Sequence, residues 1–112
     1  MKLVGRIKRS QIEGGELLRV KYPPYDVLIA LVDGAPYAIE DACNHAGASL
    51  AEGWRDVHSP NCVGCPMHGY LFDLKTGALV SPKGLCDAQR PFVTRIEGDD
   101  ILIYDPVQLT IF

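Results

Sequence analysis

Two short segments of the chain each place a cysteine close to a histidine. In the segment CNHAG one residue separates Cys43 from His45, and in the segment CPMHG two residues separate Cys65 from His68. Thiolates and imidazoles are both metal ligands, so two of each permit a tetrahedral zinc site. They equally permit a 2Fe–2S cluster in which the two thiolates bind one iron and the two imidazoles bind the other.

The order of the four residues favours iron over zinc. A zinc finger groups cysteine with cysteine and places its histidines on a helix, whereas each segment here is mixed, and Pro66 and Gly69 disfavour a helix in the second. A two-iron cluster needs mixed loops, because each loop must supply one ligand to each iron. Gly47 and Gly69 would let the backbone lie close to such a cluster.

Other uses of the same cysteines remain open at this point. A nucleophilic pair of Cys65 and His68 would need a third orienting group and a substrate pocket, and it leaves the first segment unexplained. The C-x-x-C formed by Cys62 and Cys65 could be half of a zinc ribbon with Cys43 and Cys86, or a redox dithiol. Neither would use the two histidines. We therefore interpret Cys62 as a buried strand thiol and Cys86 as a loop thiol.

The elements that position these segments are predicted to be β-strands. Long helical periodicity is absent, and short apolar or alternating runs are separated by turn dipeptides such as Asp33-Gly34 and Thr76-Gly77. We expect a short helical turn early in 46–64, with loop in the rest of it and in 81–91. The tail, PVQLTIF, is an edge strand or a docking segment. The strands and hairpins are expected at 15–22, 26–32, 35–41, 70–80 and 92–105.

The composition limits the class of protein. With 112 residues, 47% of them hydrophobic, the chain suits one domain with a real core. A net charge of −3 and a pI near 5.5 argue against nucleic-acid binding. No apolar run approaches the length of a membrane span, and the charged N-terminus does not resemble a signal peptide. We therefore expect a cytoplasmic protein whose cysteines are reduced.

The two segments resemble the Rieske 2Fe–2S family. That family has Cys-x-His, a spacer, then Cys-x-x-His-Gly, and CNHAG followed by CPMHGYLFDLKTG matches it closely over residues 43–77. The resemblance implies an all-β fold, with an antiparallel sandwich or barrel-like base. It also implies a single domain, 1–112, in which a small cluster-binding subdomain at about 42–85 is inserted. Residues 81–84 resemble the proline-containing loop that covers the cluster.

The resemblance also assigns the ligands of one 2Fe–2S cluster per chain. Cys43 and Cys65 would bind one iron, and His45 and His68 the other. Respiratory members carry Ser and Tyr hydroxyls that donate to sulfur near the second loop, whereas this chain has Tyr70 and Phe72 at those positions. Phe72 has no hydroxyl, and the hydroxyl of Tyr70 would be displaced by its ring. Fewer donors predict a reduction potential at the low end of the Rieske range, which spans roughly −150 to +300 mV.

The remaining residues indicate a carrier rather than an enzyme. An oxygenase adds an iron site of two histidines and a carboxylate, and once the ligands are assigned only His58 is left. We expect a monomeric electron carrier, similar to Rieske-type ferredoxins, that takes one electron from an NAD(P)H-dependent flavoprotein reductase and passes it to a terminal oxygenase. The alternatives are the small subunit of an assimilatory nitrite reductase and a zinc-binding interaction module.

Overall fold

The computed structural model describes residues 1–44, 47–67 and 69–106 and is almost entirely β. Within these residues the helical elements are two 3₁₀ turns, η1 (Arg9–Gln11) and η2 (Leu50–Glu52). The all-β prediction is therefore confirmed. In chain order the strands are β1 (Lys2–Lys8), β2 (Leu18–Val20), β3 (Val27–Val32), β4 (Ala35–Glu40), β5 (Trp54–Arg55), β6 (Cys62–Gly64), β7 (Leu71–Asp73), β8 (Leu79–Ser81), β9 (Pro91–Glu97) and β10 (Asp100–Asp105).

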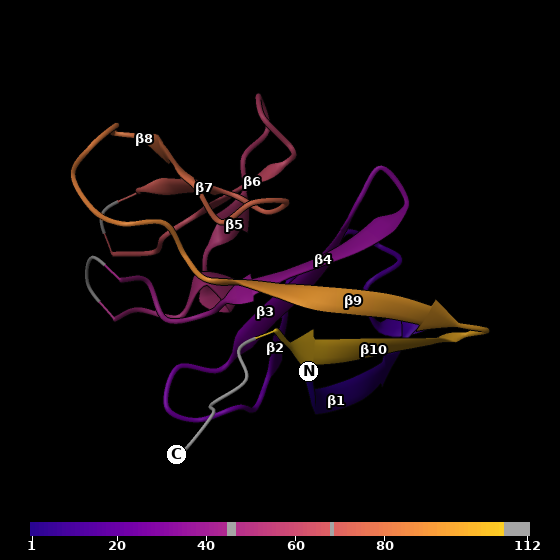
Figure 1. Cartoon of the computed structure of the whole chain (residues 1–112). Coiled ribbons are helices and arrows are strands. Elements are labelled where there is room, and N and C mark those ends of the chain that lie inside the picture. Colours follow the sequence, from indigo (N-terminus) through magenta and orange to yellow (C-terminus); the bar gives the residue numbers. More distant parts are fainter. Residues whose placement is uncertain (45–46, 68, 107–112) are drawn as a thin grey trace, which may run out of the picture.

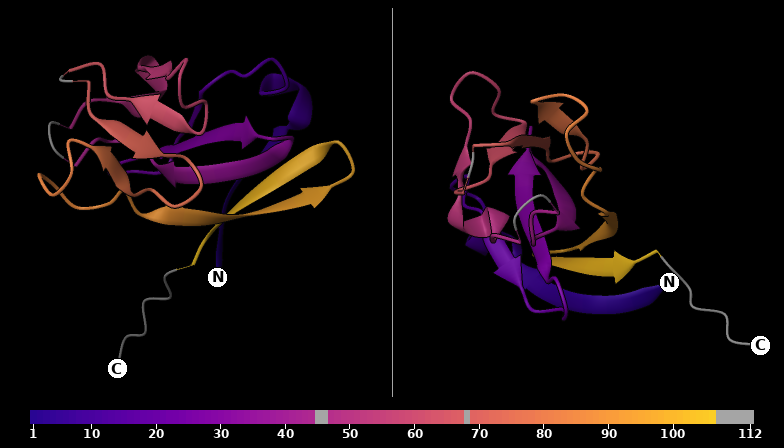
Figure 2. Two further views of the ribbon diagram at one scale, coloured as in Figure 1. Left: turned by 90° about the horizontal axis from the view of Figure 1, so that it is seen from above. Right: turned by 90° about the vertical axis from the view of Figure 1, so that its left-hand side faces the viewer.

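The strands form two antiparallel sheets. The larger sheet has the order β1-β10-β9-β4-β3-β2, and the smaller sheet has the order β5-β6-β7-β8. Figure 1 shows the smaller sheet above the β3–β4 hairpin, on the side away from β1 and β10. The two further views in Figure 2 show that the larger sheet is strongly curved rather than flat. This curvature is the expected consequence of strand twist accumulating over six strands.

Strand β3 separates two hydrophobic clusters. Leu28, Ala30 and Val32 belong to the cluster on the side of the smaller sheet, whereas Val27 and Ile29 belong to the other cluster. Successive side chains of a strand point to opposite faces, so alternate residues of one apolar run fill both clusters. The sequence prediction of a strand buried on both faces is confirmed.

The cysteine segments follow strands of the two sheets. The first segment leaves the end of β4, which pairs with β3 along its whole length in a register that runs from Val27–Glu40 to Val32–Ala35. The second segment connects β6 to β7, which pair with each other from Cys62–Asp73 to Gly64–Leu71. Each segment is therefore anchored next to a pair of hydrogen-bonded strands.

The structure also differs from the sequence predictions. Strand β1 was not predicted, and it pairs with β10 over Lys2–Lys8. Strands β5 and β6 lie in the stretch predicted to be loop after its helical turn, and the strand expected at 15–22 is reduced to β2. The tail from residue 107 lies outside the described residues. No helix in the described part of the chain is long and apolar enough to cross a bilayer.

Candidate metal centre

The two candidate cysteine ligands are buried in the same hydrophobic cluster. Cys43 is 1% exposed and Cys65 is 0% exposed, and the cluster that holds both also contains Leu28 and Phe72. The fold thus brings together two thiols that are 22 positions apart in the numbering. The other two candidates, His45 and His68, lie outside the described residues.

The first loop is closed on its cysteine by two backbone hydrogen bonds. The N–H of Cys43 donates to the carbonyl of Ala48 at 2.8 Å, and the N–H of Gly47 donates to the carbonyl of Cys43 at 2.6 Å. Gly47 has a φ of +73°, in the left-handed region that glycine adopts without strain. The turn therefore strongly favours glycine at its fifth position.

The second loop repeats this turn. The N–H of Cys65 donates to the carbonyl of Tyr70 at 2.8 Å, and the N–H of Gly69 donates to the carbonyl of Cys65 at 2.9 Å. Gly69 has a φ of +70°. The two loops thus share one backbone pattern, with glycine four residues after each cysteine. The sequence places the histidines at the third position of one turn and the fourth of the other.

The two remaining cysteines have the roles expected of non-ligands. Cys62 lies in β6 and is 5% exposed, and burial raises the pKa of its thiol. Cys86 lies in the loop before β9, packs against the cluster that holds Cys43 and Cys65, and also has a pKa raised by burial. A raised pKa keeps a thiol protonated and inert. No disulfide joins any of the four cysteines, so none competes with a metal for a thiol.

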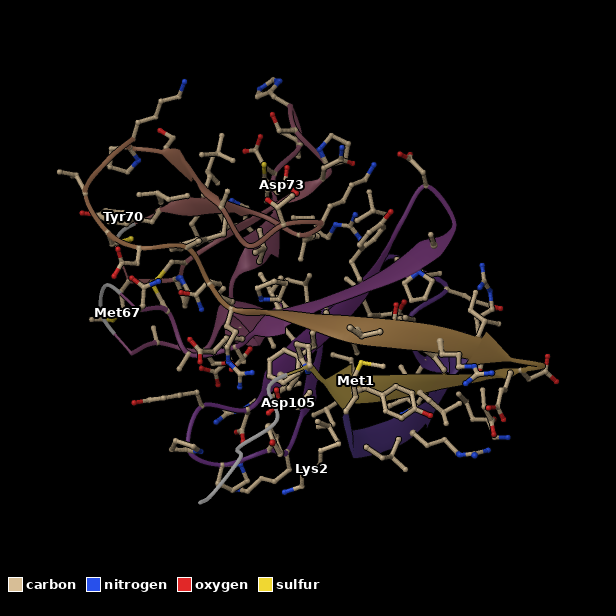
Figure 3. The ribbon with its side chains drawn as sticks, viewed as in Figure 1. Met1, Lys2, Met67, Tyr70, Asp73 and Asp105 are labelled. Atoms are coloured by element: carbon tan, nitrogen blue, oxygen red, sulfur yellow. The ribbon has the colours of Figure 1, made fainter. Side chains whose placement is uncertain are left out.

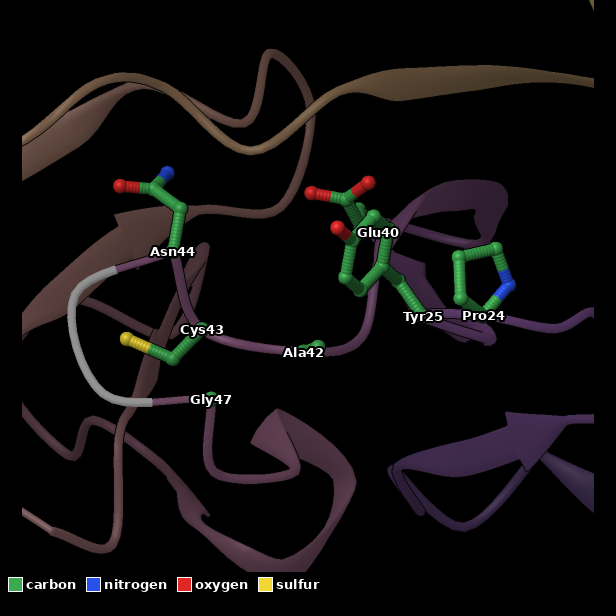
Figure 4. A pocket seen from close by; sticks show the side chains of 7 residues that line it. All are labelled: Pro24, Tyr25, Glu40, Ala42, Cys43, Asn44 and Gly47. Atoms are coloured by element: carbon green, nitrogen blue, oxygen red, sulfur yellow. The ribbon is translucent and has the colours of Figure 1, made fainter.

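A hollow of about 560 Å³ lies beside the first loop. Figure 4 shows that the side chain of Cys43 points away from Tyr25, Glu40 and Pro24, which line the other end of the hollow. Burial raises the pKa of Glu40 above its usual range. The hollow therefore borders the backbone of the first loop and does not receive the thiol.

The observed residues fit a 2Fe–2S cluster. Two thiols in an apolar environment suit an iron centre with thiolate ligands better than a hydrated ion, and the matched turns present them from two loops. Met67 beside the second loop is 60% exposed, and Leu85 is 62% exposed in the loop between β8 and β9, which we call the third loop. Figure 3 shows Met67 and Tyr70 toward the same end of the molecule, away from Met1 and Lys2.

One residue of this region was missed by sequence reasoning. Gln89, at the end of a stretch predicted to be loop, is 0% exposed. A polar residue in a loop that is rich in proline, glycine and charge is ordinarily solvated, so its composition gave no sign of burial.

Comparisons with known proteins find relatives that match most of the chain. The chain is 35% identical, over 80% of its length and 79% of the relative, to the biphenyl 2,3-dioxygenase ferredoxin component of Rhodococcus jostii RHA1. It is 37% identical, over 84% of its length and 85% of the relative, to the 3-phenylpropionate/cinnamic acid dioxygenase ferredoxin subunit of Shigella boydii serotype 4.

A solved structure of the reduced oxygenase with oxidised ferredoxin in carbazole 1,9a-dioxygenase contains a similar chain, with a TM-score of 0.78 and 26% identity. The likeness covers 94% of this chain and 97% of that one. The Rieske [2Fe-2S] domain pattern matches residues 3–89. With its fold, its paired cysteine turns and this match, the chain belongs to the Rieske [2Fe-2S] domain family.

Proposed function

We propose that this protein is the ferredoxin component of an oxygenase system that acts on aromatic compounds. It takes one electron from a flavoprotein reductase that oxidises NAD(P)H and delivers it to a terminal oxygenase. The observation that carries this proposal is the pair of buried cysteines in matched turns. The proposed partners are supported by the likeness of this chain to two ferredoxin components of dioxygenases and to a chain in a ferredoxin–oxygenase complex.

The proposed ligands are Cys43 and Cys65 on one iron, with His45 and His68 on the other. A cluster of this type supplies a one-electron couple. The residues 42–85 would form the subdomain that carries it, inserted in a domain that spans 1–112. We place the protein in the cytoplasm, as a monomer, because its reductant is cytoplasmic and its carrier role needs free diffusion.

The protein's own residues would keep water from the thiols. Val63, Phe72 and Leu74 are each 0% exposed and belong to the cluster that contains both cysteines. Apolar burial of this kind limits solvent access and tunes the potential of a metal site. Phe72 has no hydroxyl to donate to sulfur, which supports a potential in the lower part of the Rieske range.

Electron transfer between purified components tests the proposal. The protein is reduced anaerobically by NADH with a catalytic amount of the reductase of an aromatic-ring dioxygenase, and its visible absorbance is followed. Oxidised oxygenases of this class, beginning with the biphenyl enzyme, are then added without oxygen. We expect uptake of one electron per chain and rapid transfer to at least one oxygenase. A protein that dithionite reduces, but that exchanges electrons with neither component, would contradict the proposal.

A further inference from the structure

Gln89 connects the third loop to the first cysteine loop through the interior. It precedes β9, and its side chain is fully buried. A buried primary amide costs free energy unless its two N–H donors and its oxygen find partners. The positions of those partners therefore show which segments of the backbone the side chain holds in place.

Both the nitrogen and the oxygen of the Gln89 side-chain amide form hydrogen bonds. Its Nε2 donates to the carbonyls of Glu40 at 2.8 Å and Ala42 at 2.7 Å. Its Oε1 accepts from the backbone N–H of Asn44 and from Asn44 Nδ2, both at 2.8 Å. The amide therefore holds the residue before Cys43 and the residue after it.

The backbone of Gln89 is fixed from the opposite side. Its N–H donates at 2.8 Å to the carbonyl of Gly77, in the turn between β7 and β8. A Cβ on Gly77 would overlap the carbonyl oxygen of Gln89, so the two backbones are in direct contact. Since β7 continues directly from the second cysteine loop, Gln89 links the supports of both loops.

We propose that Gln89 is a positioning residue that sets the place of Cys43 and, through it, the electronic environment of the cluster. The inference rests on the proposed ligand role of Cys43. Hydrogen bonds on both sides of a ligand restrict its backbone more strongly than bonds on one side. The first loop would then be held by one side chain from outside the loop in addition to its own backbone hydrogen bonds.

The substitution Gln89→Met tests this proposal, because it keeps an unbranched side chain of similar length and removes all four hydrogen bonds. Loss of a buried backbone partner of this kind makes local opening easier, and we expect amide hydrogen exchange in residues 40–50 to accelerate roughly tenfold. Exchange in the second loop, residues 63–72, should stay within about twofold of wild type. The EPR g values of the reduced, cluster-loaded variant should shift.

Two further variants make the test specific. Gln11→Met removes a glutamine whose Oε1 accepts from Lys8 N far from both cysteine loops, so it should leave the exchange of both loops and the g values unchanged. Asn44→Ala removes two hydrogen bonds of an exposed side chain, one to Gln89 Oε1 and one to the carbonyl of Asp87, and keeps the backbone bond to Gln89. It should accelerate exchange of residues 40–50 by roughly threefold, and it serves as the test if Gln89→Met does not fold.

The outcomes separate this inference from the proposed function. A wild-type protein that carries the cluster, with variants whose first-loop exchange and g values equal those of wild type, would overturn the inference alone. Equal acceleration in both loops would show a general structural role and would overturn it too. A wild-type protein that binds no 2Fe–2S cluster would overturn the proposed function, and this inference with it.

Discussion

At the residue scale, the cysteines differ in what their surroundings allow. Cys43 and Cys65 begin matching turns and share one buried cluster, whereas Cys62 lies within a strand and Cys86 in a separate loop. The spacing of cysteine and histidine already identified the first two as candidates. A glycine stands four residues after each of these cysteines in the sequence, but only the hydrogen bonds of the structure show that the two loops form the same turn.

We therefore expect the iron content of the protein to respond differently to the loss of the Cys65 thiol and of the Cys86 thiol. Cys65→Ala should lower the iron content of the purified protein by more than about tenfold, because a ligand is lost. Cys86→Ala should retain the iron and the visible spectrum, because its protonated thiol only fills space. Iron analysis of both variants, purified in parallel, is the measurement. A Cys86→Ala protein without iron would contradict our ligand assignment.

The role of Gln89 could not be predicted at this scale. Its burial depends on contacts with residues 40–44, which lie far away in the sequence and reach it only after β4 and β9 pair. A local sequence pattern contains no information on such a contact, and a glutamine among charged neighbours is predicted to be exposed. By contrast, the cysteine and histidine pairs could be identified as candidate ligands from their spacing in the sequence alone.

At the scale of elements, the sequence predicted those strands whose pattern is set by burial. Strand β3 and the hairpins β7–β8 and β9–β10 were found because their apolar runs and turn dipeptides are local features. Strand β1 was missed because Ile7 is its only buried residue, while Leu3 is 51% exposed. Its existence depends on pairing with β10 at the other end of the chain, which no local signal reports.

The contact between the β7–β8 turn and the third loop gives a prediction at this scale. Gly77→Ala should lower the free energy of unfolding by at least about 2 kcal/mol, because the new Cβ meets the Gln89 carbonyl and the residue has a φ of +80°. Gly84→Ala is the matched control, since its φ is +79° but nothing lies near the new Cβ. Urea unfolding of both variants measures the difference, and equal losses would contradict the predicted clash.

At the scale of the whole molecule, two exposed apolar side chains mark opposite ends. Met67 is 60% exposed beside the second loop, whereas Ile96 is 50% exposed near the end of β9. In the orientation of Figures 1 and 3 these places lie at opposite ends of the molecule. Electron transfer falls steeply with distance, so the partners should dock at the Met67 end.

This separation predicts the effect of one added charge. Met67→Glu should lower the second-order rate constant for oxygenase reduction by roughly tenfold, because the negative charge must be desolvated in the docked complex. Ile96→Glu should leave that rate within about twofold of wild type. Stopped-flow measurements at fixed ionic strength compare them, with unchanged EPR spectra as the check that the cluster is intact. A larger effect at Ile96 would place docking at the opposite end.

The acid stability of the molecule depends on Asp26, a buried carboxylate before β3. The backbone N–H of Tyr22 donates to it at 2.8 Å, and this bond, with help from Arg19, holds the pKa of Asp26 below its usual range. The folded protein thus keeps the charge at pH values where the unfolded chain, with a pKa of about 3.9, takes up a proton. Its contribution is complete above that value and is lost as the pH falls through the folded pKa.

Asp26→Asn tests this dependence, since asparagine tolerates the φ of +60° at this position. Wild type should be the more stable protein at pH 7, and the difference in urea midpoint should shrink as the pH falls from about 5 to about 3. A difference that stays constant over this interval would show that the carboxylate charge contributes nothing.

The most direct test of our account is pulsed EPR of the dithionite-reduced protein, with histidine labelled in ¹⁵N. We predict a 2Fe–2S signal with strong coupling to two histidine nitrogens, and loss of one of these couplings when His45 or His68 is replaced. A 2Fe–2S signal without histidine coupling, or a colourless protein that holds zinc, would contradict the assignment of Cys43, His45, Cys65 and His68 as ligands.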